Sequence, residues 1–310
     1  MLVEPGPQDG SGGRGQAIAG AGARSYLYVP ADRPDRLERA ASRGADALIL
    51  DLEDAVPPGG KHGARRLLAG WLAHQADQPG HSCELWVRIN PGAAAADITA
   101  VAGPGLTGVV VPKATPDLLA AVGQLLSGRE RVLGLPAGQF RVLPMVETAG
   151  CLLSLPAIAA APRVARLGIG EADLAADLGM QPGPGQAELM PLRLQIVVAS
   201  AAQGIAAPAA ATSLDFQDLA GLRESTQALL RLGFRARTAI HPAQIATVNE
   251  VFTPAPAEVA QAHRLIVAFE QAVRDGAGVT TGEDGRMIDL AVVRTAREVI
   301  ARAERAGRSG

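Results

Sequence analysis

Ionisable side chains lie within or just after most of the short apolar runs of this chain. Acids dominate the set, which comprises Asp51, Glu53, Asp54, Arg88, Lys113, Glu147, Glu171, Asp173 and His241. Carboxylates that crowd into one cleft repel one another unless a cation neutralises them. Oxygen-rich sites with open coordination positions suit Mg²⁺, which keeps several waters and takes oxygens from the substrate. The set therefore predicts an acidic active site that holds a hard divalent cation.

Glu147 and Asp173 are the natural ligand pair for this cation because they follow consecutive apolar runs. Arg88 is expected beside the cation, where a fixed guanidinium can clamp a carboxylate or stabilise a developing oxyanion. Glu53 and Asp54 have an alternative role as caps at the start of a helix.

Other catalytic chemistries have little support in the sequence. The nucleophile motif G-x-S-x-G and the zinc-binding patterns H-x-x-x-H and C-x-x-C are absent. Cys83 and Cys151 are the only cysteines, and we expect two buried thiols in a reducing compartment. Lys113 follows V-V-V-P and is expected to pair with the acids, with a Schiff base as the less favoured alternative.

The elements that position these residues alternate along the chain. The predicted strands are Tyr26–Val29, Ala47–Leu50, Leu85–Ile89, Val109–Val111, Val142–Val146, Val164–Ile169, a weak run at Ile205–Ala207, and Thr238–Ile240. The predicted helices between them are Pro34–Ser42, Lys61–Ala73, Pro116–Leu126, Thr148–Ala160, Glu188–Gln203 and Leu219–Leu232. Parallel strands need crossover connections, so the alternation predicts a (β/α)8 TIM barrel of the α/β class. A doubly wound open sheet is the alternative.

The chain divides into three segments. Residues 1–23 are Gly-rich and lack periodicity, which predicts a flexible tail. The tail contains G-x-G-x-x-G at 10–15, but no strand precedes it and no helix follows, so it does not indicate dinucleotide binding. Residues 24–255 form the predicted barrel. Residues 256–310 form a C-terminal helical extension, with helices at Pro256–Asp275 and Leu290–Ala306 joined by a Gly-rich loop at Gly276–Gly285.

The composition narrows the class of protein. Of 310 residues, 48% are hydrophobic and only 3% aromatic, so the core must be built from Ala, Val, Leu and Ile. A net charge of −2 offers no basic field for nucleic acid or an anionic membrane. No apolar run approaches the ~18 residues of a membrane span, and the N-terminus lacks the order of a signal peptide. We therefore expect a soluble cytoplasmic protein.

Nine short motifs occur in order over residues 24–306. They are R-S-Y-L-Y-V-P-A (24–31), D-L-E-D-A-V (51–56), V-R-I-N-P (87–91), V-V-V-P-K-A (109–114), P-M-V-E-T-A (144–149), G-I-G-E-A-D-L-A-A-D-L-G (168–179), A-I-H-P-A-Q-I (239–245), V-F-T-P (251–254) and D-G-R-M-I-D (284–289). With these motifs the chain resembles the citrate lyase β-subunit family of the HpcH/HpaI aldolase/citrate lyase superfamily. That family includes citryl-CoA, malyl-CoA, citramalyl-CoA and β-methylmalyl-CoA lyases.

The resemblance implies a (β/α)8 barrel, a homotrimer or larger assembly, and one Mg²⁺. It implies that Glu147 and Asp173 are the metal ligands, and that Glu147 and Arg88 also contact the substrate. Arg88 would stabilise the enolate oxygen. Asp289 would be the catalytic acid/base, carried by the C-terminal extension into the active site of a neighbouring subunit.

Further contacts follow from the same resemblance. The CoA-binding residues would be Tyr28, Arg36, Arg39, Ile240 and His241. We also expect Glu53, Asp54 and Lys113 to contact the substrate. The chain departs from the family at Ala31, where glycine is usual.

The predicted function is retro-Claisen cleavage of a 3-hydroxy-3-carboxyacyl-CoA into an acyl-CoA and a 2-oxo acid. An aldolase that acts on free 2-oxo acids and a non-catalytic CoA-binding subunit are the alternatives. The identity of the 2-oxo acid (glyoxylate, pyruvate or oxaloacetate) stays open. So does the choice between a stand-alone enzyme and one subunit of a citrate lyase complex.

Overall fold

Eight parallel strands form the centre of the molecule. The computed structural model describes residues 22–76, 83–282 and 285–308. The strands are β1 Ser25–Pro30, β2 Ala47–Asp51, β3 Glu84–Arg88, β4 Gly108–Val111, β5 Arg141–Val146, β6 Arg166–Ile169, β7 Ala206–Ala210 and β8 Ala236–Ala239. Each pairs with the next and β1 pairs with β8, so the sheet closes into a barrel. The predicted (β/α)8 barrel is confirmed.

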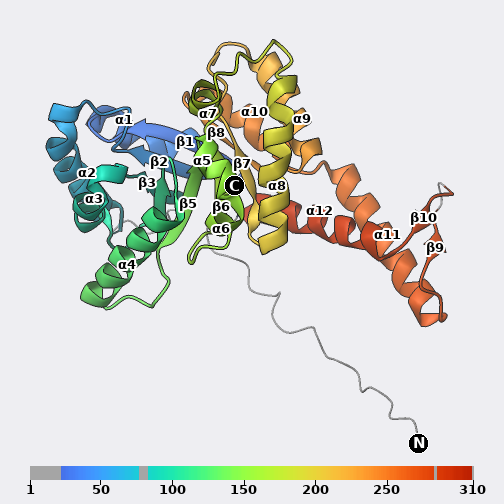
Figure 1. Cartoon of the computed structure of the whole chain (residues 1–310). Helices are drawn as coiled ribbons and strands as arrows, with labels where there is room; N and C mark the ends of the chain where they lie inside the picture. Colours follow the sequence, from blue (N-terminus) through green and yellow to red (C-terminus); the bar gives the residue numbers. More distant parts are fainter. Residues whose placement is uncertain (1–21, 77–82, 283–284, 309–310) are drawn as a thin grey trace, which may run out of the picture.

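Helices surround the strands (Figure 1). They are α1 Pro34–Ala40, α2 Lys61–Ala76, α3 Ala94–Val101, α4 Pro116–Leu133, α5 Ala149–Leu153, α6 Leu155–Ala159, α7 Glu171–Asp177, α8 Met190–Gln203, α9 Leu219–Leu232 and α10 Ala243–Phe252. Short 3₁₀ turns lie at Ala41–Arg43, Pro58–Gly60, Pro91–Ala93 and Ala187–Leu189. The helix predicted over Thr148–Ala160 is interrupted at Ser154, where α5 ends and α6 begins. The helices α3, α7 and α10 were not predicted.

The strands send alternate side chains to opposite faces of the sheet. On β1, Leu27 and Val29 pack outward in the large cluster between strands and helices, whereas Tyr26 faces the barrel interior. Tyr26 meets Trp86 edge to face inside the barrel, with ring centroids 6.4 Å apart. Small residues from other strands, including Ala47, Ala209 and Ala236, share this interior cluster with Ala165, which precedes β6, and leave room for the two rings.

The same period of two delivers charged groups to the C-terminal mouth of the barrel. Asp51 and Arg88 come two residues after the interior residues Ile49 and Trp86, so they keep the inward direction. Glu147 stands in the same relation to Met145. The apolar interior therefore ends in a charged layer, at the face where barrels of this kind carry their active sites.

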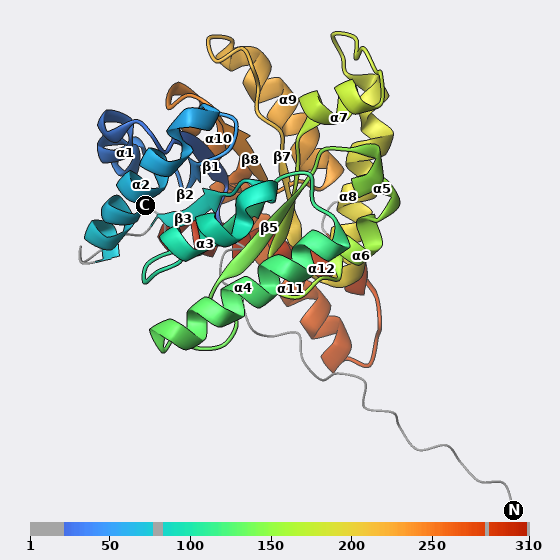
Figure 2. The ribbon, with the colours of Figure 1, turned by 60° about the vertical axis from the view of Figure 1, so that its left-hand side comes forward.

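The C-terminal extension consists of α11 Pro256–Arg274, β9 Thr280–Thr281, β10 Met287–Ile288 and α12 Leu290–Arg308. The two helices pack against each other, and the antiparallel pair β9–β10 lies at their outer end (Figure 1). In Figure 2, α11 and α12 lie below the strands and α7 lies above them. A salt bridge of 2.7 Å from Glu298 of α12 to Arg235, which precedes β8, ties the extension to the N-terminal end of the barrel.

The predicted tail falls largely outside the described residues, which begin at Gly22. Ala23 is buried, and its carbonyl accepts a hydrogen bond from Arg166 Nη1 at 2.6 Å. Both cysteines carry free thiols; Cys151 is buried and Cys83 is half-buried. In the described ranges 22–76, 83–282 and 285–308, no helix has the length and hydropathy needed to cross a membrane.

Candidate functional site

Arg88 is fixed at the mouth of the barrel by Asp51 on the neighbouring strand. Its Nε donates to Asp51 Oδ1 at 2.8 Å and its Nη2 to Oδ2 at 2.6 Å. The strand register sets these two residues side by side. Asp51 also accepts the backbone N–H groups of Glu53 and Ala55, at 2.8 and 3.1 Å. A bidentate pair of this kind, anchored by two further hydrogen bonds, fixes the plane of the guanidinium group.

The remaining nitrogen, Arg88 Nη1, meets the other acids of the second strand-to-helix loop. It lies 3.0 Å from Glu53 Oε2 and 3.5 Å from Asp54 Oδ2. Lys113 Nζ lies 4.0 Å from the second oxygen of Glu53. Burial alone would lower the pKa of Arg88, but the hydrogen bonds to Asp51 and the adjacent charges raise it above its usual value. Arg88 is therefore a permanent cation.

Glu147 forms the second part of the site, at the end of β5. Its side chain is buried, and Oε2 accepts the backbone N–H of Lys113 at 2.8 Å. Asp173 is exposed in the first turn of α7, the helix that follows β6. Burial raises the pKa of Glu147, and the charge of Asp173 raises it further. A proton or a cation near Glu147 would therefore be stabilising.

The donors of the pair fit a hard cation. Glu147 and Asp173 offer carboxylate oxygens only, and Glu147 lies against Gly170, where no side chain blocks it. In the described part of the chain, no group of three or more His, Cys, Asp or Glu residues could hold a metal ion. A cation here would complete its coordination with water or substrate oxygens, which is how Mg²⁺ is usually bound and unlike a closed zinc site.

A partly buried network that was not predicted holds the loop with Glu53 in place. Lys61 Nζ donates to the carbonyl oxygens of Leu52 and Glu53, at 2.7 and 2.5 Å. Asn90 Nδ2 donates to the same Leu52 carbonyl at 2.9 Å and is itself held by the buried carboxylate of Asp97. One signal for Lys61 was present in the sequence, since Lys61 and Lys113 are the only lysines among many arginines.

Glu171 does not join the acid cluster. Its carboxylate makes two hydrogen bonds to Arg193 on α8, at 2.6 and 2.7 Å. The same guanidinium donates to Gln186. Glu171 therefore serves as a structural ion-pair partner between α7 and α8, although it follows a barrel strand like the other acids.

The residues expected to bind CoA fall into three separate places. Tyr28 is half-buried at the barrel mouth, where the guanidinium carbon of Arg88 lies 4.9 Å from its ring centroid. Burial raises the pKa of the Tyr28 hydroxyl. Arg36 and Arg39 are exposed on α1. Tyr28 thus belongs with the acid cluster, and the two arginines lie on the outer surface.

Ile240 and His241 form a lip in the loop between β8 and α10. Ile240 is 43% exposed, and His241 stacks on Phe216 with ring centroids 4.6 Å apart. The buried Gln244 ties this loop to the loop after β7, because Oε1 accepts the backbone N–H of Ile240 and Nε2 donates to the Ser213 carbonyl. Phe216 is a member of this lip that sequence reasoning did not identify.

Asp289 lies apart from the acid cluster of its own chain. It follows β10 at the outer end of the extension (Figure 1). Its Oδ1 accepts the backbone N–H groups of Ala291 and Val292, at 2.9 and 3.0 Å, so it caps α12. Within one chain the structure does not bring Asp289 to Glu147 or Arg88.

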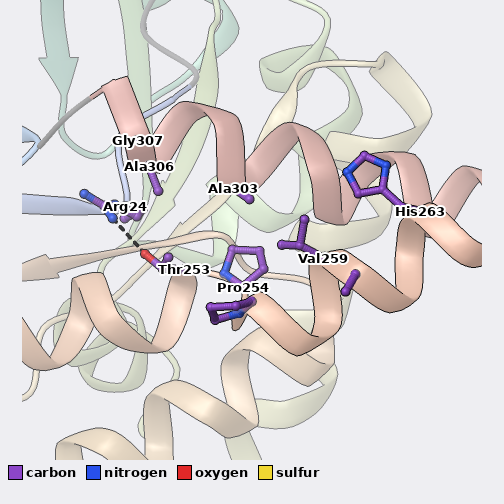
Figure 3. Close-up of a pocket in the computed structure, with 10 residues that line it drawn as sticks. Arg24, Thr253, Pro254, Val259, His263, Ala303, Ala306 and Gly307 are labelled. Carbon is purple, nitrogen blue, oxygen red and sulfur yellow. Dashed lines mark hydrogen bonds between the residues drawn. The ribbon is translucent and has the colours of Figure 1, made fainter.

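A pocket of about 610 Å³ lies between α11 and α12, at the opposite end of the barrel from the carboxylates. Its lining is mostly apolar and comprises Arg24, Thr253, Pro254, Pro256, Val259, Ala260, His263, Ala303, Ala306 and Gly307 (Figure 3). Arg24 Nη1 donates to Thr253 Oγ1 at 2.7 Å, and Asp46 binds the rest of the guanidinium. Because none of these lining residues carries a carboxylate, we assign the chemistry to the charged mouth and not to this pocket.

Replacing Glu53 by glutamine is expected to flatten the pH dependence of stability. Burial raises the pKa of Glu53 from 4.5 to about 7, with further repulsion from Asp54 and Glu147. The folded state thus binds this proton more tightly than the unfolded state. The contribution is fully present below pH 4.5 and is lost as the pH rises through about 7. Urea unfolding with EDTA between these pH values should show a steeper loss of unfolding free energy in the wild type than in E53Q. Equal slopes would contradict the assignment.

Comparison with known proteins supports one family. Residues 24–242 match the model of the HpcH/HpaI aldolase/citrate lyase family. A (3S)-malyl-CoA thioesterase of Cereibacter sphaeroides is 37% identical over 290 residues, 91% of this chain and 94% of the relative. An L-malyl-CoA/beta-methylmalyl-CoA lyase of Rhodobacter capsulatus is 32% identical over 320 aligned positions, 91% of this chain and 95% of the relative.

A solved structure shares both the fold and the sequence similarity. It is protein CitE from Mycobacterium tuberculosis in complex with magnesium, acetoacetate and coenzyme A, with a TM-score of 0.73 and 32% identity. The match covers 92% of this chain and 99% of that one. This chain therefore belongs to the HpcH/HpaI aldolase/citrate lyase family.

Proposed function

We propose that this protein is a Mg²⁺-dependent carbon–carbon lyase. Its substrate would be a 3-hydroxy-3-carboxyacyl-CoA of the citryl-, malyl- or citramalyl-CoA type, and its products an acyl-CoA and a 2-oxo acid. The proposal is carried by the carboxylate pair Glu147 and Asp173 at the same barrel mouth as the fixed Arg88. The malyl-CoA lyase relative and the magnesium and coenzyme A in the CitE structure support it.

Glu147 and Asp173 would hold Mg²⁺ through their carboxylate oxygens. Bound there, the ion supplies Lewis-acid stabilisation of negative charge on substrate oxygens. Two protein carboxylates leave coordination positions open for a carboxylate and a hydroxyl group of the substrate. The buried position of Glu147 and the charge of Asp173 favour a bound cation over two bare charges.

The protein side chains would then divide the bond-breaking step between them. The C3 hydroxyl gives its proton to a carboxylate at the mouth, and the oxygen's electron pair forms the C3=O bond of the 2-oxo acid as the C2–C3 bond breaks. The electron pair of the C2–C3 bond passes to C2 and the thioester oxygen as an enolate. Arg88 Nη1 stabilises the enolate oxygen, and Asp289 of a neighbouring copy protonates C2. Condensation reverses these roles.

The remaining contacts would be made by side chains around the mouth. Glu53, Asp54 and Lys113 lie within 4.0 Å of each other or of Arg88, where a polar substrate head group would sit. Arg36 and Arg39 offer exposed positive charge for CoA phosphates, and the Ile240–His241 lip offers apolar and aromatic surface for the rest of the arm.

Hydrolysis of malyl-CoA is the second candidate, since relatives with 37% identity are named thioesterases. An aldolase on free 2-oxo acids and a non-catalytic CoA-binding subunit, alone or in a citrate lyase complex, remain as alternatives. The candidates differ in their products. A lyase releases a 2-oxo acid and keeps the thioester, a thioesterase releases free thiol, an aldolase needs no CoA, and a binding subunit releases nothing.

The decisive experiment offers the protein citryl-, malyl-, citramalyl- and β-methylmalyl-CoA in turn. Each reaction is run with Mg²⁺ and with EDTA, and both the 2-oxo acid and the free thiol are measured. We expect EDTA-sensitive release of a 2-oxo acid from one thioester, without an equivalent of free thiol, and no reaction with the corresponding free hydroxy acid. Equal release of thiol and hydroxy acid would replace the lyase by a thioesterase.

A further inference from the structure

The carboxylate of Glu147 lies directly over Gly170, the residue that joins β6 to α7. A Cβ built on Gly170 would come within 2.6 Å of both Cγ and Oε1 of Glu147, and within 3.0 Å of Cδ. The backbone of Gly170 has φ −105° and ψ 88°, which other residues can adopt. Glycine is therefore needed here for space and not for its conformational freedom. Its missing side chain lets Glu147 lie against the start of α7, the helix that carries Asp173.

The other oxygen of Glu147 is held by the backbone of Lys113. Lys113 has φ 47°, in the left-handed region that non-glycine residues seldom occupy. In this conformation its N–H donates to Glu147 Oε2 at 2.8 Å. Such backbone strain persists only where the surrounding structure imposes it, and it is common at functional sites.

We propose that Gly170 and the left-handed backbone of Lys113 are positioning elements for the cation site. Together they hold Glu147 so that its carboxylate and that of Asp173 converge on one divalent ion. Lys113 thus has a role through its main chain that is separate from the charge of its side chain. The inference rests on the proposed metal-dependent function, because it concerns the same carboxylate pair.

The first test replaces Gly170 by alanine in the full-length protein. Cγ of a buried Glu147 cannot move without turning the whole side chain, so we expect Mn²⁺, used as a probe for Mg²⁺, to bind about tenfold more weakly or worse. Gly150→Ala is the matched control. Gly150 lies on α5, three residues from Glu147, and its added Cβ would meet only Thr148 Oγ1 at an ordinary 3.7 Å. Mn²⁺ affinity is measured by calorimetry, and melting temperatures in EDTA show whether both variants fold.

A second pair of variants separates the backbone of Lys113 from its side chain. Lys113→Gly and Lys113→Val both remove the ammonium group, but only the β-branched valine strongly opposes a positive φ. We expect K113G to keep Mn²⁺ affinity close to that of the wild type and K113V to lose about tenfold or more. Raising the Mg²⁺ concentration should recover turnover of G170A towards that of the wild type and turnover of K113V towards that of K113G, a rescue that a general folding defect would not show.

The outcomes distinguish this proposal from the proposed function. Wild-type affinity in G170A, or equal affinities in K113G and K113V, would overturn the positioning role while leaving metal-dependent cleavage intact. A wild-type protein that binds no Mn²⁺ would overturn both. Weakened binding in G170A and K113V, found in a protein that cleaves none of the four thioesters, would support the positioning role and reject the proposed substrates.

Discussion

Glu147→Gln is expected to abolish tight Mg²⁺ binding and to lower turnover about a thousandfold, because Lewis-acid stabilisation is worth several kcal/mol and each ~1.4 kcal/mol is tenfold. Glutamine keeps the shape of the side chain and an oxygen that can accept the Lys113 N–H. It loses one anionic ligand, and its amide cannot replace a carboxylate towards a hard cation. Calorimetry with Mg²⁺ and steady-state kinetics on the active thioester measure the two effects.

The stability of the same variant in EDTA should not fall. Burial and the neighbouring Asp173 raise the pKa of Glu147, so a neutral amide removes an unfavourable charge from the metal-free fold. The control is Asp177→Asn on the same helix as Asp173; Asp177 binds the Ala149 N–H and lies outside the acid cluster. Full turnover in E147Q, or loss of turnover with loss of folding, would contradict the assignment of Glu147 as a metal ligand.

The balance of charges explains why the site needs a cation. Five acids gather at the mouth with two cations, as the contacts among Asp51, Glu53, Asp54, Glu147, Asp173, Arg88 and Lys113 show. The bidentate ion pair with Asp51 occupies Nε and Nη2 of Arg88, so Nη1 is the nitrogen that is left to interact with both Glu53 and Asp54. An anionic substrate would enter this mouth against a net negative charge, and a bound divalent ion would reduce that repulsion.

The fold was accessible from sequence because its strands are marked by apolar runs. All eight strands were located, and the order of strands and helices allowed only a few topologies. The strand with the weakest apolar run is β7, whose sequence Ala206–Ala210 contains no β-branched residue. It was predicted weakly at Ile205–Ala207, and the observed strand begins one residue later and ends three residues later. Pairing with β6 and β8 imposes the extended backbone there, which local propensity does not reveal.

The site was accessible only in part. The strand ends placed Asp51, Arg88 and Glu147 together, but the same rule also selected Glu171, which binds Arg193. Glu171 lies two residues beyond the end of β6, in the first turn of α7, where its side chain turns towards α8. The contacts of Lys61 and the close approach at Gly170 depend on loop paths and were therefore not predicted.

The role of Asp289 can be tested because its own chain keeps it away from Glu147. Asp289→Asn retains an oxygen that can cap α12 through the Ala291 and Val292 N–H groups, but it cannot donate an acidic proton. We expect D289N to fold normally, to bind Mg²⁺ normally, and to lose turnover by about 10²–10⁴-fold, the range of general acid–base catalysis.

Co-expression of D289N with E147Q should then restore activity. In a closed ring of copies, each active site would combine Glu147 of one copy with Asp289 of its neighbour, so about one quarter of the sites in a random mixture would be intact. The matched control mixes E147Q with D173N, whose defects lie in the same barrel and cannot complement each other.

Assemblies purified through two different tags and measured by light scattering would show mixed oligomers. Activity that stays at the level of the inactive parents in such oligomers, or a monomeric protein, would refute an acid supplied by the neighbouring copy. Activity that recovers when D289N is mixed with E147Q, but not when E147Q is mixed with D173N, would mean that the helical extension belongs functionally to another copy's site. The extension would do so although it leaves its own barrel at the end opposite the carboxylates.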